Sequence, residues 1–322
     1  MADSVTVSPI EDGTRLMRWF LRHFPAMPLR DFYRLCRGGQ IRVNSARCRG
    51  QEILHTGDVI RIPPTINTYA VVQKKTESGD QFSLTDLENL RQTIIHNDDD
   101  IVVFNKPAGL AVQGGTGIRK SVDKMAAALF PYSKISLVHR LDMETSGLLV
   151  VAKTQQAAQF LSRAFQNKTA RKEYLALLNG DVRNPHGVID NYLLKGRVFD
   201  NPERENGTGA RPHHAITEYR VLSRATGMLT WVQFIPKTGR THQLRLHSAF
   251  TLGAPIVGDD LYGRASDIDA GMRSMLATNN LFLFACKLTF QHPTTGRMMT
   301  FRAPIPAFMK PIMNLLEFQM PQ

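Results

Sequence analysis

The feature that most constrains the fold is an apolar run, Leu148 to Ala152, directly preceded by a short polar segment. The run is rich in β-branched residues and too short for an independent helix, so it predicts a buried strand. The polar segment contains His139, Arg140 and Asp142, and Thr145-Ser146-Gly147 then suit a tight turn. A carboxylate on such a turn can be held rigidly, which makes Asp142 a candidate catalytic residue. Most aspartates in polar turns are caps or solvated charges, so the pattern alone leaves both roles open.

Length and composition limit the kinds of protein that the chain can be. At 322 residues, with 43% hydrophobic residues, it has room for two domains and a sizeable core in at least one. No apolar run approaches the ~20 residues that span a bilayer, and the N-terminus lacks the basic and apolar regions of a secretion signal. Three scattered cysteines (Cys36, Cys48 and Cys286) argue against a disulfide framework and a cysteine-based zinc site. We expect a cytoplasmic protein with no membrane partner, and a monomer.

Positive charge is concentrated near the N-terminus. The chain has a net charge of +12, and the segment from Thr14 to Ile62 contains ten arginines, no lysine and three acidic residues, which gives it +7. This excess favours a polyanionic partner such as RNA. Arginine suits RNA because its planar guanidinium makes bidentate contacts with phosphate and also stacks on bases. We expect Arg34, Arg37 and Arg42 to bind RNA; the alternative is a basic domain with a purely structural role.

The same segment has the pattern of a small folded module. Apolar residues recur at helical spacing from Leu16 to Phe24, which predicts a helix. Pro28 can start a second helix with Leu29 on its apolar side, and Gly38-Gly39 would end it. Two short apolar segments that follow predict strands. These segments are Ile41–Val43 and Val59–Ile62.

The rest of the chain predicts a linker and a larger second domain. Residues 67–90 are polar and turn-rich, with one short helix near Leu84–Leu90. From residue 91 onward, apolar segments typical of strands alternate with amphipathic segments typical of helices. We expect a long loop from Asn184 to Pro212. Strands are expected at 101–104 (after a hairpin turn at 97–100), 148–152, 174–177, 215–222 and 229–234, and helices at 156–166 and 241–252, the latter capped by Thr241 and ended by Gly253.

Two further patterns could suggest a bound nucleotide or metal ion, and both are incomplete. The glycines at Gly114-Gly115 and Gly117 do not follow the order of a phosphate-binding loop. His242 and His247 have no third ligand at a matching spacing. We therefore expect neither a metal ion nor a cofactor.

Several motifs resemble those of one enzyme family, the RluA-type RNA pseudouridine synthases, and the resemblance covers most of the chain. HRLDMETSGL, which begins at His139, resembles the central motif of the family, and NKPAGL resembles its first motif. KEYLAL resembles the motif that carries the family's tyrosine, and GRTHQLRLH resembles its third motif. RGGQIRVN followed by GDVIRIP resembles an S4-like RNA-binding domain. GDDLYG and LFLFACKLTFQHP also match the family, although Phe284 stands where the family usually has His.

The resemblance implies roles for individual residues. Asp142 would be the catalytic carboxylate and Arg245 its ion-pair partner. Tyr174 would lie over the reacting base and could take the C5 proton late in the reaction. An arginine within ~4–6 Å would lower the pKa of Asp142 by roughly 1–3 units. The target uridine must be flipped out of folded RNA, and Arg140 would fill the vacated place in the stack. From the residues alone, Tyr174 would equally suit core packing, and Arg245 the surface of a helix. The further residues expected to bind RNA are Arg240 and Lys106.

The resemblance also implies a fold and an activity. The fold is α+β, with an S4-like module (residues 1–66), a linker (67–90) and a catalytic domain (91–322) of mixed, largely antiparallel sheet with flanking helices. The activity is isomerisation of uridine to pseudouridine, which needs no cofactor because it involves no redox change and no donated group. Large-subunit ribosomal RNA is favoured, since the pattern most resembles the RluC branch. Whether Asp142 attacks the sugar, attacks the uracil ring or promotes elimination to a glycal stays open. The alternatives are another RNA, such as transfer RNA, or a non-catalytic RNA-binding or ribosome-assembly protein.

Overall fold

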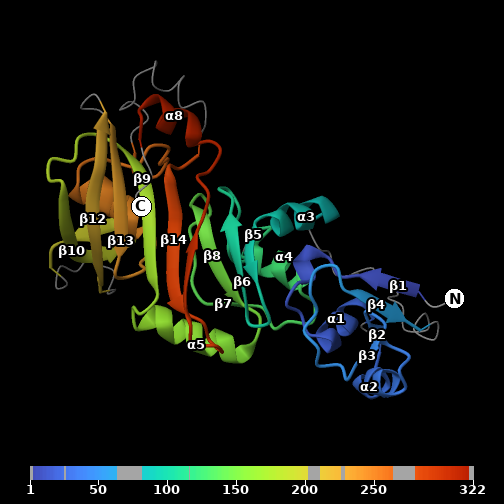
Figure 1. Ribbon diagram of the computed structural model, residues 1–322. Helices are drawn as coiled ribbons and strands as arrows, with labels where there is room; N and C mark the ends of the chain where they lie inside the picture. Colours follow the sequence, from blue (N-terminus) through green and yellow to red (C-terminus); the bar gives the residue numbers. More distant parts are fainter. Residues whose placement is uncertain are drawn as a thin grey trace.

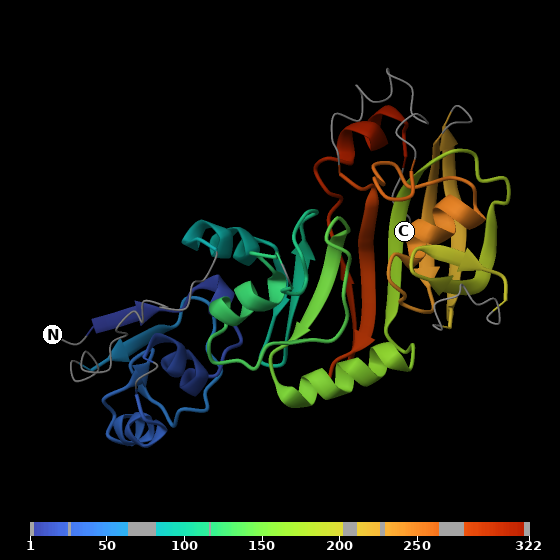
Figure 2. The ribbon, with the colours of Figure 1, turned by 180° about the vertical axis from the view of Figure 1, so that it is seen from behind.

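The computed structural model describes residues 3–24, 27–63, 82–115, 117–201, 211–225, 229–263 and 280–318. Among these residues, no helix is long and apolar enough to cross a membrane. Their strands form two sheets, one of four strands near the N-terminus and one of eleven strands (Figure 1). The small sheet lies at one end of the molecule, and the large sheet extends away from it in both ribbon views (Figures 1 and 2).

The N-terminal module contains the two helices that the sequence predicts. α1 (Leu16–His23) buries Leu16, Trp19 and Phe20 completely. α2 (Leu29–Arg37) begins directly after Pro28 and ends at Gly38. Leu29 was expected on the buried side and is instead exposed, because it opens the helix one turn before the buried stripe starts at Phe32.

The small sheet is antiparallel throughout, in the order β1-β4-β2-β3. Two of its strands were predicted. The other two, β1 and β3, are short and largely polar, so they carry no clear apolar pattern. The bounds are β1 (Asp3–Thr6), β2 (Arg42–Val43), β3 (Ala46–Arg47) and β4 (Val59–Ile62), with the short 3-10 helix η1 at Pro9–Glu11.

The N-terminal module contacts the large sheet at a hairpin turn. This turn connects β5 (Ile94–Asn97) to β6 (Ile101–Lys106), as predicted. Arg18 of α1 donates from Nη1 to the Asp99 carbonyl at 2.8 Å and to its carboxylate at 2.5 Å. Most of the predicted linker, residues 64–81, lies outside the described residues, and its predicted helix is α3 (Leu84–Gln92).

The large sheet is mixed and largely antiparallel, as predicted for an α+β fold. Its strand order is β11-β10-β12-β13-β9-β14-β8-β6-β5, with β15 paired to β14 and β7 to β8. Between the described strands, only β14 and β8 run parallel. The further bounds are β7 (Ser136–Leu137), β8 (Ser146–Ala152), β9 (Arg171–Asn179), β10 (His186–Leu194), β11 (Arg197–Phe199), β12 (His213–Ala225), β13 (Leu229–Pro236), β14 (Leu283–Gln291) and β15 (Met298–Arg302).

β8 is the predicted central strand, and all seven of its residues are buried. It begins with Ser146-Gly147, which lie beside Phe284 and Ala285 of β14. A Cβ on Gly147 would lie 2.3 Å from the Ala285 carbonyl oxygen, and its φ of 109° is unfavourable for other residues, so this close approach requires glycine. Phe284 is fully buried in the core, where an apolar side chain replaces the family's usual histidine.

The expected loop from Asn184 to Pro212 is wrong where the structure describes it, because it contains β10 and β11. In β10, apolar Val188 lies on the exposed face and polar Asn191 on the buried face, which breaks the apolar alternation. Residues 202–210 of this loop lie outside the described residues. The expected helix from Thr241 to Leu252 is confirmed over residues 243–251, but it begins after His242 (φ 53°) rather than Thr241, and only α6 (Gln243–Leu246) is α-helical before the π-helical turn η3 (His247–Thr251). The remaining helices are α4 (Val122–Leu129), α5 (Gln155–Gln166), which passes across one end of β8 and β14 in Figure 1, and α8 (Lys310–Leu315).

Candidate active site

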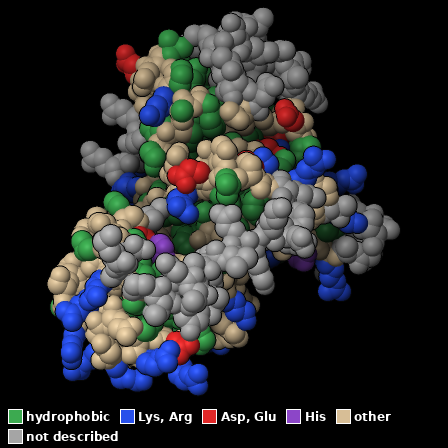
Figure 3. Space-filling model, turned by 90° about the vertical axis from the view of Figure 1, so that its right-hand side faces the viewer, with side chains coloured by type: hydrophobic (Ala, Val, Ile, Leu, Met, Phe, Trp, Pro, Cys, Tyr) green, Lys and Arg blue, Asp and Glu red, His purple; other side chains and the backbone are tan. Residues whose placement is uncertain are grey.

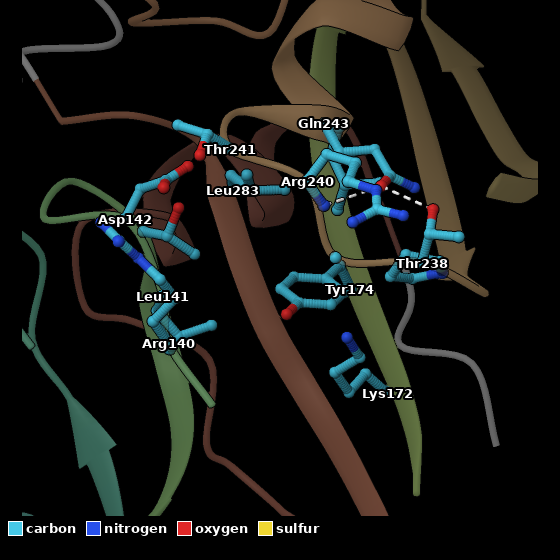
Figure 4. A pocket seen from close by; sticks show the side chains of 14 residues that line it. Arg140, Leu141, Asp142, Lys172, Tyr174, Thr238, Arg240, Thr241, Gln243 and Leu283 are labelled. Atoms are coloured by element: carbon cyan, nitrogen blue, oxygen red, sulfur yellow. Dashed lines mark hydrogen bonds between the residues drawn. The ribbon is translucent and has the colours of Figure 1, made fainter. Parts of the chain in front are cut away.

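Side chains from three distant stretches of sequence surround one cavity of about 100 Å³ (Figure 4). Arg140 and Asp142 come from the loop before β8, and Lys172 and Tyr174 come from β9. Arg240 comes from the segment after β13, opposite Asp142, with Tyr174 between them (Figure 4). Of the residues that the sequence nominated, the cavity therefore brings together Asp142, Tyr174, Arg140 and Arg240.

The loop that carries Asp142 is fixed by hydrogen bonds to its backbone. The Asp142 carbonyl accepts a hydrogen bond from the Thr145 amide at 3.2 Å. The Met143 carbonyl accepts one from the Gly109 amide and one from the Lys106 ammonium, both at 2.9 Å. The backbone beside the carboxylate is thus held both from within its own loop and from the segment after β6, as a rigid functional group requires.

Lys106 was predicted to bind RNA, and that prediction is wrong because its side chain is fully buried. The sequence places it at the end of a strand, but the side chain folds back beneath the Asp142 loop. Burial lowers its pKa to about 7, opposed in part by the negative charges of Glu144 and Asp142. Its Nζ donates to three backbone carbonyls, those of Pro107 (3.0 Å), Leu110 (2.8 Å) and Met143 (2.9 Å).

We expect Lys106→Met to lower the free energy of unfolding by about 1–3 kcal/mol, because three carbonyls inside the protein lose their donor. The salt dependence of RNA binding should not change, since the ammonium does not reach the surface. Denaturant unfolding and RNA titrations across a salt series measure the two effects. Lys310→Met, at an exposed lysine of α8, is the matched control and should be neutral in both. A flatter salt dependence for Lys106→Met would reinstate Lys106 as an RNA contact.

Asp142 occupies a site that opposes its ionisation. Burial raises the pKa of its carboxyl group above the ordinary value, and the nearby negative charge of Glu144 adds to the shift. The positive charges of His242, Arg245 and Arg140 act in the opposite direction without cancelling the effect of burial. The predicted lowering of this pKa is therefore wrong, because burial outweighs the neighbouring cations.

Arg245 is bonded to Asp259 rather than to Asp142. Its Nε lies 2.8 Å from Asp259 Oδ2 and its Nη2 lies 2.7 Å from Oδ1, a bidentate pair between two buried side chains. Burial works against the charge of Arg245, but this pair raises its pKa. No ion pair joins Arg245 to Asp142 in the described structure, which corrects the predicted direct pair. Arg245 instead acts on Asp142 through its longer-range field.

One donor of Arg245 is left without a hydrogen bond. Nη1 is buried and lies 3.6 Å from Glu144 Oε2, at the limit of an ion pair. Asp259 also accepts hydrogen bonds at 3.0 Å from the amides of Leu261 and Tyr262, so it fixes the GDDLYG segment as well as Arg245. In the sequence, GDDLYG matched the family without indicating a role for Asp259.

Tyr174 faces the cavity from a buried strand. Burial raises the pKa of its phenol, and the negative charge of Asp142 raises it further, so the hydroxyl stays protonated. Lys172 lies two residues earlier in β9 and therefore on the same face of the strand. Lys172 was not among the predicted site residues, although its spacing from Tyr174 in a strand would have placed it at the site.

Arg140 and Arg240 lie at the rim, where the cavity meets a larger groove of about 670 Å³. Both side chains are exposed. Arg240 Nε donates to the His214 carbonyl at 2.9 Å, and its amide donates to Gln243 Oε1 at 3.0 Å, which fixes the segment at the cavity edge (Figure 4). The predicted RNA-binding residues Arg34, Arg37 and Arg42 do not line the cavity and belong to the N-terminal module.

The histidines considered for metal binding have protein partners. His242 Nδ1 lies 2.8 Å from the Tyr262 hydroxyl. His247 is buried between Thr217 (2.9 Å from Nδ1) and Asn191 (3.0 Å from Nε2), and burial lowers its pKa to about 4. Both therefore hold the structure around α6.

Three other histidines outside the cavity are likewise engaged. Ligand atoms of Asp98, Asp100 and His292 lie within 4.8 Å of one another, but Asp98 Oδ2 is already hydrogen-bonded to His96 and His292. His139 Nε2 accepts a hydrogen bond from the Val150 amide at 3.0 Å, and burial lowers its pKa to about 3. His139 is thus a neutral ring that holds its loop against β8.

Comparison with known proteins identifies the family. Residues 100–250 match the profile of the RNA pseudouridylate synthases. Ribosomal large subunit pseudouridine synthase C of Haemophilus influenzae is 36% identical over 313 residues, covering 97% of this chain and 94% of that protein. The enzyme of the same name from Escherichia coli is 34% identical over 302 residues, covering 94% and 92%. Human RNA pseudouridylate synthase domain containing 4 has a similar structure, with a TM-score of 0.62, 26% identity and coverage of 74% of this chain and 98% of that one. The chain therefore belongs to the RNA pseudouridylate synthase family.

Proposed function

We propose that this protein isomerises specific uridines to pseudouridine in large-subunit ribosomal RNA, in the cytoplasm. The observation that carries the proposal is a half-buried carboxylate, Asp142, that shares a cavity with the buried phenol of Tyr174 under a cationic rim. Relatives that cover nearly the whole chain are named ribosomal large subunit pseudouridine synthase C, which supports the choice of RNA.

The reaction breaks the N1–C1′ bond of uridine, turns the uracil and joins C5 to C1′, while C5 loses a proton and N1 gains one. Asp142 either attacks as a nucleophile or stabilises positive charge at C1′. Tyr174 stacks on the ring, and its raised pKa argues against a phenolate base. Asp142, whose raised pKa makes it a stronger base than an ordinary aspartate, takes the C5 proton in this proposal. Arg140, exposed at the rim, fills the place that the flipped uridine leaves.

The alternative is a protein that binds RNA without catalysis. A binder gains nothing from a half-buried carboxylate beside a cationic rim, because its partial burial costs free energy and the charge repels phosphate. The cavity in which Asp142 and Tyr174 meet therefore favours an enzyme.

Pseudouridine mapping of ribosomal RNA from cells with and without the gene tests the proposal. Specific large-subunit positions should lose their pseudouridine without the gene, and purified protein should restore them in vitro. Loss confined to transfer RNA would move the substrate to that class. No change at any position in either RNA would favour the non-catalytic alternative.

We further propose that residues 1–66 are an S4-like RNA-binding module, joined through a linker at 67–90 to a catalytic domain at 91–322. The supporting observation is a row of arginines across the small sheet. Arg42 pairs in register with Arg47 on one side and Arg61 on the other, which places the three side chains on one face. In Figure 3, Lys and Arg side chains border this end of the molecule.

Neighbouring arginines differ in how free they are to bind phosphate. Arg42 donates to the Gly39 carbonyl at 3.0 Å, and Arg34 pairs with Asp31 at 3.1 Å. Arg37, Arg47 and Arg61 are exposed. These three are therefore the better targets for a test that leaves the fold intact.

Replacing Arg37, Arg47 and Arg61 together by Gln should flatten the slope of log K against log salt by about 2–3 units, if each contacts one phosphate. Single-turnover rates at saturating RNA should stay within about threefold, because these residues do not line the cavity. RNA titrations across a salt series measure the slope. The control replaces Arg183, Arg220 and Lys310, three exposed cations of the catalytic domain outside the cavity and groove, by Gln. Equal slopes for the two triple variants would show that the arginine row does not contact RNA phosphates.

A further inference from the structure

The catalytic cavity and the larger groove adjoin each other, and Lys172 lies where they meet. The catalytic cavity and the larger groove are both lined by Lys172, and the groove continues away from Asp142 and Tyr174. The groove runs between the end of α5 and the segment 235–240, both of which contribute to its lining. In Figure 4 the side chain of Lys172 lies below Tyr174, and its ammonium group points toward Tyr174. The residues common to both linings are Arg140, Lys172, Pro236, Thr238, Gly239 and Arg240.

The ammonium of Lys172 stands apart from the ion pairs and hydrogen bonds of the described residues. Neither a hydrogen bond nor an ion pair connects it to another residue in the described parts of the chain. The adjacent carboxylate, Glu173, points to the other face of β9, where it bonds Lys287 (3.0 Å) and Gln233 (2.8 Å). Lys237 also lines the groove, but it pairs with Glu218 at 2.8 Å. Within the described residues, Lys172 is thus a half-buried cation that no carboxylate pairs with.

Partial burial makes the charged form of Lys172 unfavourable in free energy. Burial lowers the pKa of Lys172, which means that the site disfavours the charge that it holds. A bound anion would remove this penalty, and a phosphate suits a compact ammonium with three donors. Asp142, which shares the cavity with Lys172, forms no ion pair with it among the described residues, and Glu144 pairs with Arg245 instead.

We propose that Lys172 binds the phosphate next to the target uridine, at the point where the RNA backbone turns to carry the flipped base into the cavity. The assignment rests on the proposed function, because only a nucleotide seated on Tyr174 must pass its backbone through this border. The base occupies the cavity, the strand on one side continues in the groove, and the connecting phosphate lies between them, beside Lys172. Lys172 is therefore a binding residue, whereas Asp142 carries the chemistry.

The test combines a protein variant that lacks the Lys172 charge with RNA in which one phosphate is replaced by an uncharged methylphosphonate. Full-length protein and Lys172→Met are titrated with RNA oligonucleotides that contain a mapped target uridine and a single methylphosphonate at each flanking position in turn. Lys172→Met should weaken binding to unmodified RNA about tenfold and flatten the salt slope by about 1 unit, while Lys172→Arg keeps most of the affinity. One methylphosphonate, directly 5′ or 3′ of the target, should weaken binding of the unaltered protein to the same degree. The combination should lose little more, since both changes remove the same contact.

The controls separate this inference from the proposed function. Lys310→Met removes an equivalent lysine outside the groove and should change nothing. Single-turnover isomerisation by Lys310→Met should equal that of the unaltered protein, whereas the loss for Lys172→Met should be largest at subsaturating RNA and smaller at saturating RNA, because the variant acts on affinity. Additive losses at every phosphate position, or a chemical step slowed more than about thirtyfold with affinity intact, would overturn the assignment. If Lys172→Met fails to fold, the methylphosphonate series on the unaltered protein still decides, because no loss at either flanking phosphate rejects the contact. Absence of isomerisation by the unaltered protein would instead reject the proposed function.

Discussion

Asp142→Asn should abolish isomerisation and at the same time stabilise the fold at pH 7. Removal of a catalytic carboxylate costs roughly 10⁴-fold or more in turnover. The stability effect follows from the raised pKa of Asp142 in the folded protein. Such a group stabilises the fold below its unfolded pKa, and that contribution is lost as pH rises through the folded pKa. At pH 7 the Asp142 carboxyl group therefore lowers the stability of the fold, and neutral Asn removes this unfavourable contribution.

Two measurements check the predicted loss of turnover and the predicted gain in stability. Tritium release from C5-labelled uridine in RNA gives turnover, and denaturant unfolding at pH 7 and about pH 3 gives stability. The stability difference between Asp142→Asn and the unaltered protein should shrink toward acid pH, where the aspartate is protonated. Asp181→Asn, at an exposed aspartate outside the cavity, should leave turnover unchanged. Turnover above ~10% in Asp142→Asn would contradict the catalytic role, since such losses are normally far larger. A less stable Asp142→Asn at pH 7 would contradict the direction of the pKa.

Elements with a strong local pattern could be predicted from the sequence. β8 is continuously apolar, and the polar segment that leads into it was enough to make Asp142 a candidate. α1 and α2 have helical spacing with clear start and stop residues. In each case the information lies within about ten residues, where propensity and periodicity act.

Features that depend on distant partners could not be predicted. Lys106 looks like an exposed cation until the loop carrying Met143 folds over it. The partner of Arg245 is Asp259, in a different loop, and burial reversed the expected pKa shift of Asp142. β10 was not recognised because apolar Val188 lies on its exposed face and polar Asn191 on its buried face, which breaks the apolar alternation. The local pattern thus nominated Asp142 and the family resemblance nominated Tyr174, Arg140 and Arg245, whereas the pairing and ionisation of these residues follow from tertiary packing.

The pairing of Arg245 with Asp259 allows its structural and functional contributions to be separated. Arg245→Met leaves the buried Asp259 carboxylate without its cation, which should lower the free energy of unfolding by about 3–5 kcal/mol. Asp259→Asn in the same chain removes the unpaired charge and keeps an oxygen for the amides of Leu261 and Tyr262. The double variant should therefore regain more than half of the lost stability.

Turnover should not return with stability. Arg245 is one of the cations that lower the pKa of Asp142, so both variants should raise that pKa further and shift the acid limb of the pH–rate profile to higher pH. We expect turnover at pH 7 to stay about 100-fold or more below that of the unaltered protein in the single and the double variant alike, because a stabilising charge at the reaction centre is missing in both. Denaturant unfolding and tritium release across pH 5 to 9 measure the two quantities on the same preparations. If the double variant regained turnover together with stability, Arg245 would act only by holding the GDDLYG segment in place, and the electrostatic role toward Asp142 would be lost.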